Sequence, residues 1–585
     1  MNTEVLFLLY YVSFSFLLLP VFPSLIGMVA FVVLFLKMGH SSSKHPLEPA
    51  PIVKTVSGPV QGKTFNYEGK KIDAYMGIPY ARPPVGERRF KKPEPVDSWT
   101  ETRECFHFGP RCPQLDDFFA KRMNIVGTDE AGCLTINVIA PRQKSEEWKA
   151  GYPVMVWIHG GGFLIHSSSN YGDATVARNL CTKDVVFVSL NYRLGVFGFF
   201  TTGDQRAPGN MGLWDQTLAL KWVRDNISSF GGDPENVTIF GQSAGGASVD
   251  LLSLSPYSRD LFKRVIPMAG TAECHFVMRT KEDQASISRQ FGRFLGWKGE
   301  DNDTEDLLNF MTSQPVHTLF IDMASNKFKF EEPGNLAFAP NLDGDFFPAP
   351  ISELRKAIPY KDVLTGTTEC EGLTLGFMVQ QPFTLKGMRN ILDMIVKPIE
   401  YGDESESLKK EILDFYTKNI NVKKKREVQL AHSNMFGDYV ISNGNLKYAE
   451  KMAELGHSVY FYSFDYYNPE GFGVFRYLLP FRAPSHAVEL RYVLGKGVLS
   501  KFKPNEDDLK VLKMMTTWFT NFAKYGNPNG KDGKGVWERH SHSSPYRHLR
   551  IKLPGPEMLD NYQDRRCDFW YEKVFPRNKQ LSKIF

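Results

Sequence analysis

The stretch NVTIFGQSAGGASV, Asn236 to Val249, decides how the rest of the chain is interpreted. It begins with the β-branched and aromatic run Val237–Phe240, which is typical of a short buried strand. The pattern G-x-S-x-G follows, centred on Ser243, and small residues continue it into a segment that can form a helix. Glycines on either side of Ser243 allow a sharp turn and close packing of helix on strand. The stretch therefore predicts an exposed, potentially nucleophilic Ser243 hydroxyl at a helix N-terminus, with an ordinary structural turn as the alternative.

A second apolar run, Pro153–Ile158, leads directly into HGGGF, residues 159–163. Three consecutive glycines present backbone N–H groups without side chains in the way, which is what an oxyanion hole requires. A flexible loop or a phosphate cradle is the alternative interpretation. A phosphate cradle favours a lysine after the glycines, and this chain has Phe163 there.

The order of the predicted elements indicates the fold class. Val185–Leu190 is a third buried strand, and Trp214–Asn226 has helical spacing of its apolar residues. Alternating strands and helices predict an α/β fold in which helices cover both faces of a sheet. The composition is that of a globular protein, and a formal net charge of only +5 over 585 residues argues against a nucleic-acid partner.

The N-terminal region differs from the rest. Val5–Leu36 is almost wholly apolar, longer than the ~20 residues that span a bilayer. We therefore expect residues 1–38 to be a hydrophobic membrane segment and the polar, proline-rich residues 39–51 to be a linker. The segment could be one kinked membrane helix, a hairpin bent at Pro20–Pro23, or a cleaved signal ending near Pro23.

Three long motifs together carry a family resemblance. They are GNMGLWDQTLALKWVRDNISSFGGDPENVTIFGQSAGG at residues 209–246, HGGGF at 159–163 and GIPYARPPVGERRF at 77–90. In their order along the chain they resemble the type-B carboxylesterase/cholinesterase family of α/β-hydrolases. The resemblance implies one catalytic domain, residues 52–575, with a central mostly parallel sheet and an active-site gorge. Residues 576–585 then form a basic C-terminal tail.

A nucleophilic serine needs a base and an acid, and in this fold they follow it in the order Ser, acid, His. Glu369 and Glu371 both lie after a short apolar strand and both qualify chemically. The family's acid directly precedes a glycine, which selects Glu371. For the base, His486 lies in a loop that leads into a helix and matches the family pattern, whereas His457 opens a strand and His159 belongs to the glycine loop.

The resemblance also implies the chemistry. Ser243 attacks an ester carbonyl, His486 carries the proton, Glu371 orients His486, and a covalent acyl-enzyme is then hydrolysed. The N–H groups of Gly161, Gly162 and Ala244 are expected to bind the oxyanion. No metal or cofactor is expected, since the chain has no H-E-x-x-H motif and no paired C-x-x-C. The alternatives are an acyltransferase that uses the same acyl-enzyme and a non-catalytic adhesion protein, and the complete set of triad residues favours an enzyme.

Two departures from the cholinesterases indicate the substrate class. Gln242 stands where they carry a glutamate that helps to attract a cation. The loop from Cys112 to Cys133 contains no tryptophan, whereas the choline site places one there. Both departures favour neutral, largely apolar esters.

The seven cysteines bear on the cellular compartment. Cys112 and Cys133 match the family's first disulfide, whereas Cys274 and Cys567 lack their usual partners, so at most one family disulfide is expected. Unpaired cysteines, and lysines that follow the apolar segment, favour a cytosol-facing domain. The resemblance favours a lumenal or extracellular one, which we take as the expectation, and sequons at Asn226, Asn236 and Asn302 would allow glycosylation there.

Overall fold

The computed structural model describes residues 48–115, 125–320, 336–469, 477–497, 502–579 and 581–584. The predicted membrane segment, residues 1–38, lies outside this part of the chain. Within the described ranges, no helix is both long and apolar enough to cross a membrane.

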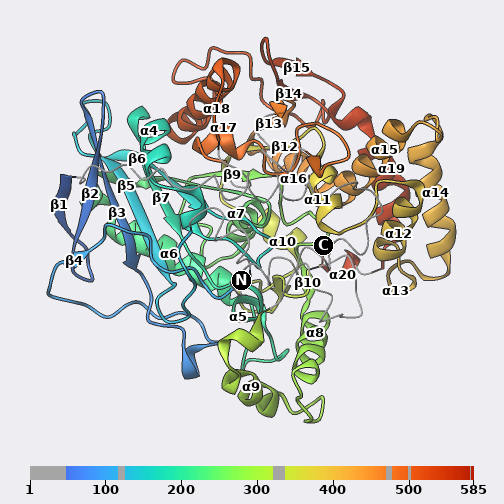
Figure 1. The fold of residues 1–585 in the computed structure, drawn as a ribbon, viewed down its shortest axis with the longest axis horizontal. Helices are drawn as coiled ribbons and strands as arrows, with labels where there is room; N and C mark the ends of the chain where they lie inside the picture. Colours follow the sequence, from blue (N-terminus) through green and yellow to red (C-terminus); the bar gives the residue numbers. More distant parts are fainter. Residues whose placement is uncertain are drawn as a thin grey trace, which may run out of the picture. The chain divides into compact units, whose positions relative to one another are not determined.

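A 13-stranded sheet forms the centre of the folded domain (Figure 1). Its main path runs in the order β1 (Glu48–Lys54), β2 (Pro59–Tyr67), β3 (Lys70–Pro79), β5 (Thr135–Pro141), β7 (Val186–Leu190), β6 (Tyr152–Ile158), β8 (Gly232–Gln242), β9 (Arg264–Met268), β12 (Asp362–Thr368), β13 (Ser458–Phe464), β14 (His548–Ile551) and β15 (Glu557–Leu559). The short strand β4 (Arg103–Glu104) pairs with β2. The strands from β7 to β14 along this path are parallel, and the strands at both ends are antiparallel.

Helices cover both faces of the sheet, as the sequence predicted. Side chains along β6 alternate between two apolar cores, with Val154, Val156 and Ile158 in one and Met155 and Trp157 in the other. The first core is closed by α6 (Met211–Asn226), α7 (Ala244–Leu254), α8 (Lys281–Phe294) and α16 (Asn443–Glu454). The second is closed by α4 (Ala174–Asn179), α17 (Leu490–Leu494) and α18 (Glu506–Tyr525). The fold is therefore an α/β sandwich of helix, sheet and helix layers.

A further helical group has a core of its own. It contains α12 (Leu385–Ile395), α14 (Ser405–Thr417) and α15 (Lys425–Gly437) together with Trp570 and Val574 from the C-terminal region. Helix α11 (Glu371–Met378) packs against α15 and joins this group to the sheet. The range predicted as a basic tail contains the short helix α20 (Leu581–Ile584), in which Ile584 is buried.

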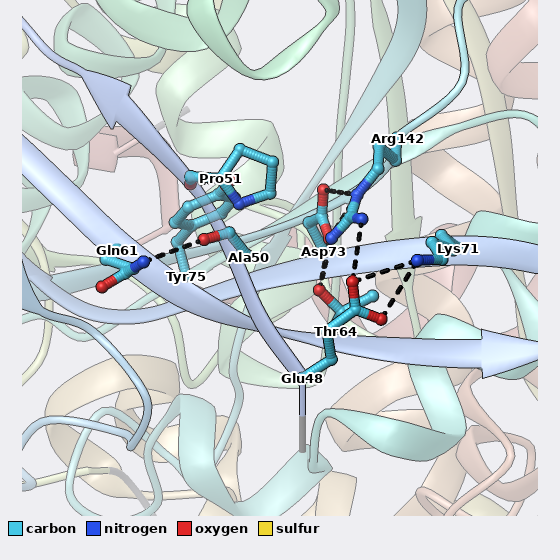
Figure 2. A network of polar contacts seen from close by, with 9 residues as sticks. All are labelled: Glu48, Ala50, Pro51, Gln61, Thr64, Lys71, Asp73, Tyr75 and Arg142. Carbon is cyan, nitrogen blue, oxygen red and sulfur yellow. Dashed lines mark hydrogen bonds and ion pairs between the residues drawn. The ribbon is translucent and has the colours of Figure 1, made fainter.

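A network of polar contacts links β1 to residues of β3 and to Arg142 (Figure 2). The Glu48 carboxylate accepts hydrogen bonds from Lys71 Nζ at 3.0 Å and from Arg142 Nη1 at 3.4 Å. The Tyr75 hydroxyl donates to a main-chain carbonyl of β1 at 2.8 Å. Residues 48–51 thus belong to strand β1, although the sequence suggested the range 39–51 as a linker.

Parallel strands bring the candidate residues to one edge of the sheet. The glycine loop follows β6, Ser243 follows β8 and Glu371 follows β12. His486 lies in the connection that follows β13. Because neighbouring parallel strands end at the same edge, segments far apart in the chain meet there, and Gln242 and His486, which are 244 positions apart, come into contact.

Candidate active site

Ser243 occupies a strained turn between β8 and α7. Its φ of 60° and ψ of −129° lie outside the regions that most residues adopt, and its side chain is partly exposed. Close packing enforces the turn, because a Cβ at Gly245 would lie 2.2 Å from the Ile158 carbonyl oxygen. The Ser243 N–H donates to the Met268 carbonyl at 2.9 Å. The residue therefore has the sharp, rigid geometry of a nucleophile elbow.

The glycine loop lies directly against this turn. A Cβ at Gly160 would be 2.3 Å from the Gln242 carbonyl oxygen and 3.2 Å from Ser243 Cβ. Gly161 and Gly162 have φ values of 114° and 61°, and among the described residues the recorded backbone hydrogen bonds use the Gly161 carbonyl and neither N–H group. The loop thus has two N–H donors that remain available next to Ser243.

A third donor comes from the helix behind the serine. Ala244 is the first residue of α7, and N–H groups in the first turn of a helix have no partner within the helix. The positive end of the helix dipole also lies there. The elbow and the glycine loop together can therefore stabilise negative charge on an atom bonded to Ser243 Oγ.

Glu371 is the first residue of α11 and has a fully buried side chain. Its Oε1 accepts hydrogen bonds from the Thr368 N–H at 2.6 Å and the Thr368 hydroxyl at 3.0 Å. Its Oε2 lies 2.5 Å from His486 Nδ1. Glu369, the other sequence candidate, has an exposed side chain and contributes its backbone N–H to the Phe464 carbonyl.

His486 is held in a loop that is bonded to α11. Cys370 N–H donates to the Pro484 carbonyl at 3.0 Å, and the hydroxyls of Thr374 and Ser485 lie 2.7 Å apart. The imidazole itself is buried. With Nδ1 donating to Glu371, Nε2 is left as the acceptor that a general base requires.

The side-chain amide of Gln242 faces this imidazole. Its Nε2 lies 3.4 Å from Nδ1 and 3.3 Å from Nε2 of His486, distances at the long end of hydrogen bonding. The hydrogen bonds recorded among the described residues do not include one between Ser243 Oγ and His486. Such catalytic contacts are often long without substrate and shorten when substrate binds.

His159 and His457 have buried and half-buried surroundings, respectively, that suit a structural role and not a general base. Burial lowers the pKa of His159 to about 3, and its ring stacks on Tyr192 with centroids 4.5 Å apart. The Nδ1 atom of His457 accepts the Lys361 N–H at 3.2 Å, and burial lowers the pKa of that imidazole to about 4. Both were set aside on sequence grounds.

Glu489, three residues after His486, is a buried carboxyl that the sequence analysis did not single out. It directly precedes α17, but its side chain is fully buried, and neither oxygen has a hydrogen-bond partner among the described residues. Burial, and then the charge of Glu371, raise the pKa of Glu489 well above its ordinary value. A helix-capping acid and a buried acid look the same in sequence, so only the packing distinguishes them.

The cysteines form a single disulfide. Cys112 and Cys133 are bonded, as the resemblance implied. The other five are free and buried, and burial raises the pKa of Cys105 to about 11 and of Cys274 to about 12. These thiols are therefore poor nucleophiles at neutral pH.

Comparison with known proteins identifies the family. The model of the Carboxylesterase family matches residues 49–570. The chain belongs to the carboxylesterase family. It is 46% identical to Esterase cest-33 of Caenorhabditis elegans over 92% of this chain and 96% of that protein. It is 30% identical to Liver carboxylesterase 1 of Oryctolagus cuniculus over 90% of this chain and 94% of that protein. It is also 30% identical to Cholinesterase of Mus musculus, over 91% of this chain and 88% of that protein.

These matches make the protein a carboxylic ester hydrolase with the α/β-hydrolase fold that the sequence predicted. Its elbow, glycine loop and buried Glu371–His486 pair lie at the carboxyl edge of the sheet. In this carboxylesterase, that edge is the candidate active site.

Proposed function

We propose that this carboxylesterase hydrolyses neutral, largely apolar esters through a Ser243–His486–Glu371 triad. The observation that carries the proposal is the buried hydrogen bond between His486 Nδ1 and Glu371 Oε2, next to a serine on a strained elbow. Each element has a distinct task in a two-step acyl transfer.

In the first step, Ser243 Oγ attacks the ester carbonyl carbon while His486 Nε2 takes the hydroxyl proton. Glu371 keeps the proton on Nδ1 and stabilises the imidazolium that forms. The N–H groups of Gly161, Gly162 and Ala244 bind the oxyanion, and one such donor is typically worth about 3–4 kcal/mol in the transition state. His486 then protonates the leaving alcohol.

In the second step, water attacks the acyl-enzyme, with His486 again acting as base, and the acid product leaves Ser243. An alcohol in place of water would make the enzyme an acyltransferase. The triad geometry serves both reactions equally, so hydrolysis is favoured by the relatives, which are named esterases and carboxylesterases.

The preference for neutral esters rests on Gln242. Its uncharged amide, not a carboxylate, faces His486 beside the elbow. A cationic substrate therefore gains no ion pair from this position. The greater identity to a nematode esterase than to a cholinesterase is consistent with this preference.

We further propose that residues 1–38 attach the enzyme to a membrane, with residues 52–575 as a lumenal or extracellular catalytic domain. The long apolar run carries the attachment, and the Cys112–Cys133 disulfide supports the compartment. A cytosol-facing domain is the alternative, favoured by the five free thiols.

An ester panel with product analysis tests the function. Nitrophenyl butyrate should have a higher kcat/KM than acetylcholine, and added alcohols should not divert the acyl group from water. A higher kcat/KM for acetylcholine would overturn the substrate class. Quantitative appearance of the transferred ester would identify an acyltransferase instead.

A further inference from the structure

We propose that a surface beside the catalytic centre docks on bilayers that contain anionic lipid and takes up apolar esters from them. This inference rests on the proposed function, because it names the source of the substrate. The docking surface consists of five exposed apolar side chains and four consecutive basic residues: Phe377, Met378, Leu430, Tyr477, Leu478 and Lys423–Arg426.

The apolar members are unusually exposed for their size. Phe377 is 39% exposed, Met378 43%, Leu430 39% and Leu478 52%. Single exposed apolar residues need no explanation, but several gathered from separate elements of a fold indicate an interaction site.

Helices α11 and α15 bring the first two elements together. They touch at their glycines, since a Cβ at Gly372 would lie 2.6 Å from the Gly437 nitrogen and a Cβ at Gly376 would lie 3.3 Å from His432 Cε1. These contacts also run antiparallel, because the later residue of α11 meets the earlier one of α15. The C-terminal end of α11, with Phe377 and Met378, therefore lies near the N-terminal half of α15.

The third element is the chain that leads to His486. Phe481 shares an apolar cluster with Leu373 of α11, and Leu479 packs against it. The Arg426 guanidinium of α15 lies 3.7 Å from the centre of the Phe481 ring. This segment thus bridges α11 and α15, which places Leu478 at the same surface.

Charge selects an anionic lipid surface as the partner, and because anionic lipids gather on the cytoplasmic leaflet, docking of this kind goes with the cytosol-facing alternative for the catalytic domain. Lys423, Lys424, Lys425 and Arg426 are all exposed, and Glu427 offsets Lys424 at 3.0 Å. Leu430 follows Arg426 by four positions and so shares its helix face. Lysine is depleted in protein interfaces, whereas lysines around an apolar centre are typical of binding to anionic bilayers. Each such cation strengthens binding roughly fivefold.

The position of this surface gives it a role in catalysis. Helix α11 starts at Glu371, and the bridging segment continues to Ser485, which contacts Thr374 of α11. A bilayer docked there would lie beside the catalytic pair. An ester dissolved in the bilayer could then reach the site without entering water, where apolar esters are poorly soluble.

A fluorescent reporter on the docking surface tests the contact with lipid. The full-length enzyme carrying Met378→Cys is labelled with an environment-sensitive dye, which is selective because the five native free thiols are buried. It is reconstituted into phosphatidylcholine vesicles with and without phosphatidylserine, which also contain a spin-labelled quenching lipid. Val536→Cys, 41% exposed and outside the docking surface, is the matched control.

We expect quenching at position 378 that increases with phosphatidylserine and is absent at position 536. Replacing Lys423, Lys424 and Lys425 by Gln should weaken docking on the order of a hundredfold, and so abolish that quenching. The same replacement of three other exposed lysines, Lys531, Lys534 and Lys552, should leave it unchanged.

Measurements of ester turnover distinguish a failure of this inference from a failure of the proposed function. The triple variant at 423–425 should hydrolyse vesicle-borne nitrophenyl palmitate at least severalfold more slowly than wild type, with soluble nitrophenyl butyrate unaffected. Equal quenching at both positions, or no effect of the triple variant, would overturn the docking surface. In samples without lipid, shielding of the dye at position 378 that increases with protein concentration would also overturn the docking surface. It would indicate that a second copy of the chain covers this surface. Failure to hydrolyse nitrophenyl butyrate would instead refute the proposed function.

Discussion

Oε2 of Glu371 lies 2.5 Å from Nδ1 of His486, and this hydrogen bond is buried between two segments 115 residues apart in the chain. The other oxygen of the same carboxylate is bonded twice to Thr368. The acid is therefore held in one orientation, and it holds the imidazole in turn. Such a pair positions a general base before substrate arrives.

Removing the charge of Glu371 tests this relationship. Glu371→Gln should lower kcat by roughly 10³–10⁴-fold, because an amide can stabilise the wrong imidazole tautomer and cannot balance an imidazolium. Glu369→Gln is the matched control, two residues away with an exposed side chain, and should stay near wild type. Steady-state kinetics on nitrophenyl butyrate measures both. A larger loss in Glu369→Gln would show that the wrong carboxylate has been assigned.

Changing Gln242 tests the substrate preference. Gln242→Glu places a carboxylate near His486, at the position where the wild-type amide lies 3.3 Å from Nε2. The ratio of kcat/KM for acetylcholine to that for nitrophenyl butyrate should rise at least roughly fivefold, since a nearby charge attracts the cation. An unchanged ratio would mean that substrate charge is sensed elsewhere.

Glu489 predicts a pH-dependent effect on stability. Its raised folded-state pKa means that the unfolded chain loses this proton at lower pH than the folded chain. Its contribution to stability is therefore complete below the unfolded pKa and is lost as pH rises towards the folded value. Glu489→Gln has no titrating group at this position. The difference in Tm between this variant and wild type should therefore increase, in favour of the variant, by roughly 1 °C per pH unit above about pH 4.5.

Thermal melts from pH 5 to 8, at about one-unit steps, measure the difference. Glu68→Gln serves as the control, because Glu68 is exposed in the turn between β2 and β3 and its replacement should give a nearly constant offset. A Tm difference between Glu489→Gln and wild type that stays flat with pH would contradict a raised pKa for Glu489.

The sequons provide a test of the compartment. Asn226 is buried and bonded to the Val56 N–H and the Trp222 carbonyl, and Asn236 accepts a hydrogen bond from Arg264. Asn302 is exposed in the turn before α9 (Thr304–Ser313). A lumenal domain should therefore carry a glycan at Asn302 and at neither of the other two sites.

Digestion with an N-glycosidase should shift the mobility of the wild-type protein, and Asn302→Gln should remove that shift. Protease treatment of intact microsomes, with an epitope at the C-terminus, is the independent measurement. A digested, unglycosylated band would establish the cytosol-facing alternative.

The sequence predicted the strands around the site because their signals are local. The runs at Pro153–Ile158, Val185–Leu190 and Val237–Phe240 became β6, β7 and β8. Each is buried on both faces, which requires an apolar, β-branched run that can be read directly. The sharp turn at Ser243 could also be predicted from the sequence, since close approach of two backbones needs glycine at fixed positions.

Contacts between residues far apart in the chain could not be predicted from the sequence in the same way. Glu369 and Glu371 are chemically equivalent in sequence, and only family resemblance separated them before the hydrogen bond to His486 was seen. The approach of Gly160 to Gln242 and the burial of Glu489 depend on how distant elements pack. Periodicity and composition carry no record of such contacts, so they emerge only with the structure.

The most direct test of the account is to find the residue that a fluorophosphonate labels. Mass spectrometry of the modified full-length enzyme should place a single adduct on Ser243, because that hydroxyl alone combines the elbow with the His486–Glu371 pair. Ser243→Ala should keep the wild-type melting temperature, take up no label and lose ester hydrolysis. An adduct on a different serine, or hydrolysis that survives in folded Ser243→Ala, would contradict the proposed triad.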